Sequence, residues 1–105
     1  MSRQGLNFLV QLGGESVSID TLAPELASAL GLKFSPSEAL GVPNGYVADG
    51  MGLRWWLQIH EDGAITFVGE PQPPLEGEVD WVDIAPFVAQ LLSERTQRPW
   101  AEPTG

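Results

Sequence analysis

Residues 53–68 read LRWWLQIHEDGAITFV, and this stretch decides the predicted fold. In its first half, apolar residues alternate with residues that are mostly polar. The odd positions hold Leu53, Trp55, Leu57 and Ile59, and the even positions hold Arg54, Trp56, Gln58 and His60. A period of two is typical of a β-strand with one face in the core. Residues 64–68 supply the apolar pair of a second strand, so the stretch predicts a β-hairpin.

The register of this hairpin depends on whether its loop has two residues (Asp-Gly) or three (Glu-Asp-Gly). A two-residue loop would pair apolar positions with polar ones, because a shift of one residue reverses every side chain. The three-residue loop pairs Ile59 with Ile65 and Leu57 with Phe67, and it places Gly63 at the left-handed bulge position. We therefore predict the three-residue loop.

Upstream of the hairpin, residues 46–49 are expected to form a third strand. The intervening Gly50-Met51-Gly52 would serve as the turn. This pairing would set Val47 against Trp55 in the core and Tyr46 against Trp56 on the other face. The three strands together predict an antiparallel meander.

Further towards the N-terminus, Leu6 to Leu12 alternates and predicts another strand. Asp20 is expected to cap a helix that Gly31 ends. The motif Ser-Pro-Ser-Glu at 35–38 has the form of a capping box and predicts a single helical turn.

On the C-terminal side, residues 69–77 contain three prolines and predict an extended connector. Asp83 is expected to cap a second helix that ends near Gln97. Asp80 competes with Asp83 for this role. The apolar stripe of the helix would consist of Ile84, Phe87, Val88, Leu91 and Leu92.

The expected fold class is α+β. A three- to four-stranded antiparallel sheet, in the order strand, helix, three-strand meander, helix, would be covered by two helices. Residues 1–98 are expected to form a single globular domain, because 105 residues fit one domain of ordinary size. Residues 99–105 are expected to form a flexible tail, from which Trp100 could dock back onto the domain.

Charge limits the classes of partner. The chain has 14 Asp and Glu against 5 Lys and Arg, for a net charge of -9, and residues 55–94 hold eight carboxylates without one Lys or Arg. Such a surface repels nucleic acid and anionic membranes and attracts basic partners. No signal-peptide pattern or apolar stretch of membrane-spanning length is found, so we expect a cytoplasmic protein with no membrane contact.

No residue pattern indicates catalysis, a cofactor or a metal. The absence of Cys excludes disulfides and thiolate sites, and a single His makes a serine triad a poor prediction. His60-Glu61-Asp62 is ordinary turn chemistry, and neighbouring turn residues diverge rather than converge on one ion. We predict a protein that is not an enzyme and that uses no cofactor.

Two groups of residues are candidates for partner binding. The first is an acidic run with one aromatic: Glu70, Glu76, Glu78, Asp80, Trp81 and Asp83. The second is the more polar face of the meander: Tyr46, Arg54, Trp56, Gln58 and His60. Carboxylates steer and capture basic groups, and aromatic side chains anchor interfaces. The alternatives are an acidic loop that only keeps the protein soluble, and a Trp56 that packs beneath the C-terminal tail or the proline-rich connector.

These features favour a small acidic binding protein that inhibits a basic protein. A small, acidic, cysteine-free chain without a catalytic pattern has the general character of bacterial immunity proteins, which neutralise a cognate toxin enzyme. One alternative is an anti-defence protein that mimics nucleic acid. Another is a structural or adaptor module that self-associates, for instance as a homodimer, through its sheet face.

Overall fold

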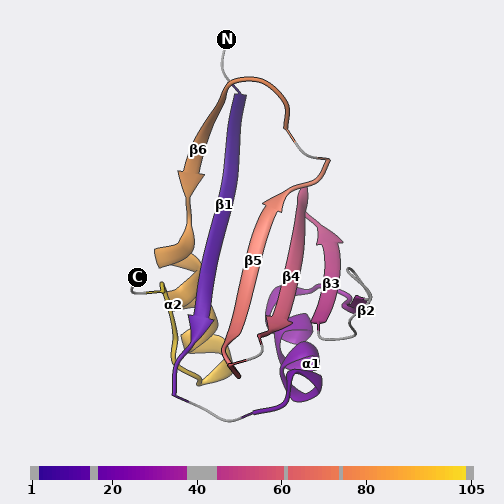
Figure 1. Cartoon of the computed structure of the whole chain (residues 1–105), viewed down its shortest axis with the longest axis vertical. Coiled ribbons are helices and arrows are strands. Elements are labelled where there is room, and N and C mark those ends of the chain that lie inside the picture. The colour runs from indigo at the N-terminus through magenta and orange to yellow at the C-terminus, as the bar shows by residue number, and fades with distance from the viewer. Residues whose placement is uncertain (1–2, 15–16, 38–44, 61, 74, 104–105) are drawn as a thin grey trace.

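A computed structural model describes residues 3–14, 17–37, 45–60, 62–73 and 75–103 (Figure 1). Within these residues, seven strands and two helices follow one another. They are β1 (Arg3–Leu12), α1 (Ile19–Leu30), β2 (Ser35–Ser37), β3 (Gly45–Gly50), β4 (Leu53–Ile59), β5 (Ile65–Pro71), β6 (Val79–Asp83), α2 (Ala85–Thr96) and β7 (Trp100–Ala101).

The strands form one sheet in the order β2-β3-β4-β5-β1-β6, and β7 pairs with the C-terminal end of β1. All pairs are antiparallel except β1 and β6, which run parallel. The α+β class is thus confirmed. The sheet is wider than the predicted three to four strands, because β2, β6 and β7 were not predicted.

The central hairpin has the predicted register. Ile59 pairs with Ile65 and Leu57 pairs with Phe67. Gly63 has a φ of +87°, as its bulge position requires. The alternation then places Leu53, Trp55, Leu57, Ile65 and Phe67 in the core.

The predicted register of the preceding hairpin is wrong by one residue. The turn has two residues, Met51 and Gly52, with φ values of 55° and 75°, as in a type I′ turn. Val47 therefore pairs with Trp56, and Tyr46 pairs with Leu57 on the opposite face. A change of one residue in loop length reversed the faces of the whole strand.

Two local predictions on the N-terminal half also need correction. Ser18, not Asp20, caps α1, because the Ser18 Oγ accepts the Asp20 N–H at 3.1 Å. Residues 35–37 form the edge strand β2 rather than a helical turn, with Pro36 paired to Tyr46. Proline is tolerated on such an edge. Glu38 of the predicted capping box lies outside the described residues.

The acidic segment is not a connector throughout. β5 extends to Pro71, and residues 79–83 form β6 beside β1. Asp83 Oδ1 accepts the Ala85 N–H at 2.9 Å. Asp83 therefore pairs with the first backbone N–H of α2 and helps to cap the helix, although Ile84 is the N-cap residue. α2 ends before Gln97, as predicted. Phe87 is 65% exposed and does not belong to the apolar stripe.

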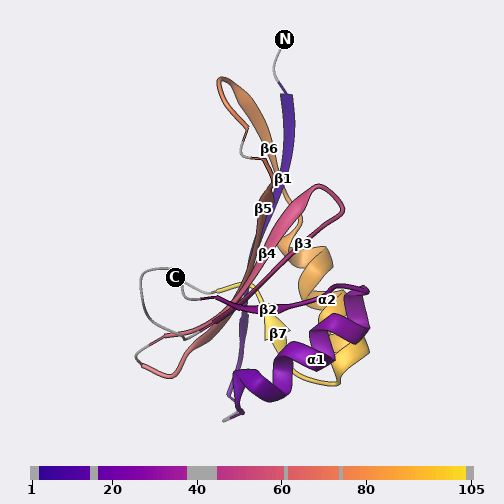
Figure 2. The same cartoon turned by 90° about the vertical axis from the view of Figure 1, so that its right-hand side faces the viewer.

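Both helices lie on one side of the sheet (Figure 2). They cover only part of that face, and β6 and the N-terminal part of β1 extend beyond them. Trp100 docks into the hydrophobic core with 4% exposure, and its ring lies 6.4 Å from that of Phe67. Within the described ranges, no helix is long and apolar enough to cross a membrane.

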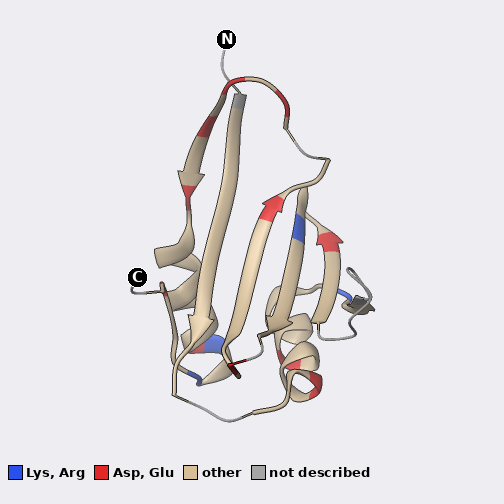
Figure 3. Ribbon diagram, viewed as in Figure 1, with Lys and Arg blue, Asp and Glu red and all other residues tan. Residues whose placement is uncertain are grey.

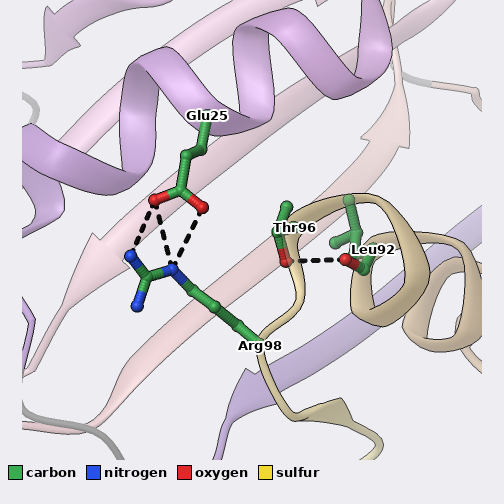
Figure 4. A network of polar contacts seen from close by, with 4 residues as sticks. All are labelled: Glu25, Leu92, Thr96 and Arg98. Carbon is green, nitrogen blue, oxygen red and sulfur yellow. Dashed lines mark hydrogen bonds and ion pairs between the residues drawn. The ribbon is translucent and has the colours of Figure 1, made fainter.

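An ion pair joins the end of α2 to α1. Arg98 Nη2 lies 2.8 Å from Glu25 Oε2, and its Nε also donates to this carboxylate (Figure 4). The Thr96 hydroxyl donates to the Leu92 carbonyl at 2.6 Å and secures the last turn of α2. The Arg98–Glu25 pair therefore links the two helices of this layer.

Candidate protein-binding face of the sheet

The face of the sheet opposite the helices carries a row of apolar side chains. Val47, Trp56, Val68 and Leu9 are cross-strand neighbours on β3, β4, β5 and β1. Leu9 is 43% exposed, and the other three are half-buried. None of the described helices lies on this side (Figure 2). We call these four residues the apolar row.

A charged row borders the apolar row on one side. Asp49, Arg54 and Glu70 are cross-strand neighbours. Arg54 Nε donates to Asp49 Oδ1 at 2.8 Å, and its guanidinium lies 5.9 Å from the centre of the Trp56 ring. The hydrogen bond from Arg54 lowers the pKa of Asp49 and raises the pKa of Arg54. The one Arg of this row is therefore engaged by its own neighbour.

A polar row borders the other side. Gln58, Thr66 and Gln11 are paired across β4, β5 and β1. His60 lies just beyond β4 and is exposed. Its Nε2 lies 2.8 Å from Thr66 Oγ1, within hydrogen-bond distance. Directed polar groups around an apolar centre are typical of protein interfaces.

A hollow of about 540 Å³ opens where β1 and β5 separate. Its lining includes Asn7, Leu9, Glu70, Trp81 and Asp83. Trp81 is 52% exposed. Its ring fits here because Gly5, its cross-strand neighbour, has no side chain: a Cβ on Gly5 would lie 2.8 Å from Trp81 Cζ3. The hollow thus combines an aromatic wall with two carboxylates.

The structure brings most of the predicted site residues to this face. They are Arg54, Trp56, Gln58, Glu70, Trp81 and Asp83, with His60 at the margin. Members of both predicted groups therefore lie on one surface, because β1 lies between β5 and β6.

Four predicted residues lie elsewhere. Tyr46 is on the helical side, where its hydroxyl donates to Asp20 of α1. Asp80 points to the opposite face of β6 from Trp81, since successive side chains of a strand alternate. Glu76 and Glu78 are exposed on the connector. Figure 3 shows the carboxylates gathered along the connector and β6 and at the ends of β3 and β5.

Sequence reasoning missed the rest of the apolar row, Val47, Val68 and Leu9, as well as Asn7. Leu9 did carry a signal, because it is an apolar residue out of phase with Phe8 and Val10. Such a residue predicts a strand with apolar side chains on both faces.

The described residues contain no group of three or more His, Asp and Glu side chains placed to hold a metal ion. Comparisons with protein-family models, with the curated proteins and with the solved structures give no match for this chain.

Proposed function

We propose that this chain is a cytoplasmic, non-enzymatic protein that binds and inhibits a basic protein, most like an immunity protein acting on a toxin enzyme. The observation that carries the proposal is the apolar row, which no described helix covers and which carboxylates border. An exposed apolar patch with a polar rim is typical of a protein interaction site.

The aromatic side chains of this face suit an interface anchor. Trp56 belongs to the apolar row, and Trp81 lies on the same face of the sheet, on β6 beyond β1. Tryptophan is enriched among the residues that contribute most binding energy, because it buries a large area with little loss of side-chain entropy. A partner seated on this face would cover both rings.

The charge of the molecule favours a basic partner over a second copy. Glu70 and Asp83 both line the hollow of this face, and the whole chain carries a net charge of -9. A face-to-face homodimer would bring two sets of these carboxylates together, and like charges across an interface weaken it. A partner with Lys and Arg at matching positions gains attraction instead.

The experiment starts with affinity capture from the native lysate at low salt, followed by identification of the retained protein and an inhibition assay of its activity. Trp56→Ala is expected to weaken binding of that protein by about 2 kcal/mol, roughly 30-fold. Phe87→Ala is the matched control, because Phe87 is an exposed aromatic on the helical side. Equal effects of the two substitutions would contradict the proposed face.

Charge reversal tests the acidic rim separately. Glu70→Lys combined with Glu76→Lys and Glu78→Lys is expected to slow association several-fold at low salt, because rim charges act mainly on the association rate. Glu94→Lys on α2 serves as the control for a change of charge away from the face. Unchanged association of the triple variant would remove the acidic residues from the proposal.

The same preparation separates the two alternatives. Competition by DNA for the captured partner would favour nucleic-acid mimicry, since both would then occupy one basic site. A concentration-dependent dimer in sedimentation, lost in Trp56→Ala, would favour a self-associating module.

A further inference from the structure

β6 and the N-terminal half of β1 together form an arm of the sheet. Residues 8–12 of β1 pair with β5, whereas residues 3–7 pair with β6. The two halves of β1 therefore have different neighbours. In Figures 1 and 2, residues 3–7 and 79–83 extend as a parallel pair of strands past both helices.

Both faces of this arm are exposed. Leu6 and Val82 are cross-strand neighbours on one face, with exposures of 44% and 42%, and Trp81 on the other face is 52% exposed. A two-stranded ribbon is only marginally stable in water, and parallel pairing is slightly weaker than antiparallel pairing. An additional strand at the outer edge of β6 would increase the pairing, and its side chains would lie beside Val82 on one face and Trp81 on the other.

The outer edge of β6 is open for such pairing. Among the described residues, β6 pairs with β1 alone. The Ile84 N–H donates to the Asn7 carbonyl at 2.9 Å, and backbone groups alternate in direction along a strand. The N–H groups of residues 80 and 82 therefore point to β1, and those of Val79, Trp81 and Asp83 point outward.

We infer that this edge binds an extended basic segment of the partner by strand addition, an inference that rests on the proposed function. Backbone hydrogen bonds would supply affinity, and side chains of alternate residues would supply specificity. The added strand would continue the sheet from β6. Its side chains on one face would lie beside Trp81 and Asp83.

The negative charge beside the outer edge of β6 indicates which kind of segment binds there. Glu78 and Asp83 flank the edge and are exposed, and the segment from 55 to 94 has no Lys or Arg to offset them. Pairing of β6 with β6 of a second copy would double these carboxylates along one edge. A strand in which Lys or Arg alternates with β-branched residues would instead place its positive charges beside them.

The probe is a peptide of about eight residues that alternates lysine with threonine or valine, a length that matches one added strand. Amide hydrogen exchange of the full chain is followed by NMR with and without the peptide. Strand addition predicts that exchange of the Val79, Trp81 and Asp83 N–H groups slows at least tenfold at saturation. Exchange at Asp80 and Val82, whose N–H groups face β1, is expected to change much less.

The matched control peptide has the same sequence with N-methyl groups on alternate residues, which keeps the charge and removes the edge hydrogen bonds. It is expected to bind at least tenfold more weakly. Equal binding of both peptides, or binding without slower exchange at the three outward groups, would overturn strand addition. If exchange at these groups slows as the protein concentration is raised without peptide, the edge pairs with a second copy of the chain. That result would overturn the inference.

A pair of variants separates this inference from the proposed function. Val79→Pro removes one outward N–H, and Val79→Ala trims the side chain but keeps that N–H. With the captured partner, Val79→Pro is expected to weaken binding at least fivefold more than Val79→Ala. Equal binding by the two variants, together with the predicted loss in Trp56→Ala, would reject strand addition and leave the proposed function in place.

Discussion

At the residue scale, Tyr46 shows how one side chain links the two layers. It is the only tyrosine of the chain, and its hydroxyl on β3 donates to the Asp20 carboxylate on α1. This hydrogen bond is the main reason that the pKa of Tyr46 is raised above 10.0, with burial and the negative charge of Asp20 adding to the effect. Tyr46 therefore supports the fold rather than the open face.

The raised pKa of Tyr46 in the folded state leads to a prediction for the stability of the protein at alkaline pH. The stabilising contribution of neutral Tyr46 is fully present below the unfolded pKa near 10 and is lost as the pH rises through the higher folded value. Tyrosinate absorbance is expected to give a titration midpoint that falls in Asp20→Ala. Glu94→Ala removes a carboxylate from the exposed part of α2 and should leave the midpoint in place. A midpoint that is unaffected by Asp20→Ala would contradict the assigned bond.

At the element scale, the turn of the β3–β4 hairpin places a methionine in a backbone conformation that is unfavourable for it. Met51 is 71% exposed and occupies the first central position of the turn with a φ of 55°. Residues other than glycine, asparagine and aspartate are unfavourable in this left-handed region. The packing of Ala48 and Trp55 in the core, and of Val47 beside Trp56, offsets this cost.

Met51→Asn is expected to stabilise the protein by about 0.5–1 kcal/mol, because Asn-Gly is the favoured pair for this turn. The free energy of unfolding in urea measures the effect. Met51→Leu keeps an apolar side chain with the same backbone preference and should change stability little. If both variants behave alike, the turn does not hold this strain.

At the scale of the whole molecule, the C-terminal segment connects helices and sheet. Trp100 on β7 pairs with Leu12 of β1 and packs against Phe67. Its carbonyl accepts a hydrogen bond from the Ser93 hydroxyl of α2 at 3.0 Å. Its indole N–H has no hydrogen-bond partner among the described residues. The ring therefore contributes through apolar packing.

Trp100→Ala is expected to destabilise the protein by about 3 kcal/mol, since a large buried ring leaves a cavity. Trp100→Phe keeps most of the packing and removes the unpaired N–H, so it should cost less than half as much. Thermal and urea unfolding measure both. Glu102→Ala, one residue beyond β7, is the control. Comparable losses for the Phe and Ala variants would contradict a contribution that comes mainly from apolar packing.

The open face could be predicted from the sequence only in part. Arg54, Trp56 and Gln58 follow from the alternation of one strand, because that pattern is local. Their neighbours Val68 and Leu9 come from other strands, and only the pairing of β1 with β5 brings them alongside. Trp81 and Asp83 join this face through the parallel β1–β6 pair, which connects residues 76 positions apart and leaves no local pattern.

The sequence by itself determined the elements whose signals are short-range. These are the strand β4, the three-residue hairpin with Gly63, and the helix that ends at Gly31. The tertiary structure alone decided the place of β6, the docking of Trp100 and the side on which Tyr46 lies. The physical reason is that strand pairing depends on distant partners, and a shift of one residue, as at Met51-Gly52, moves every side chain to the other face.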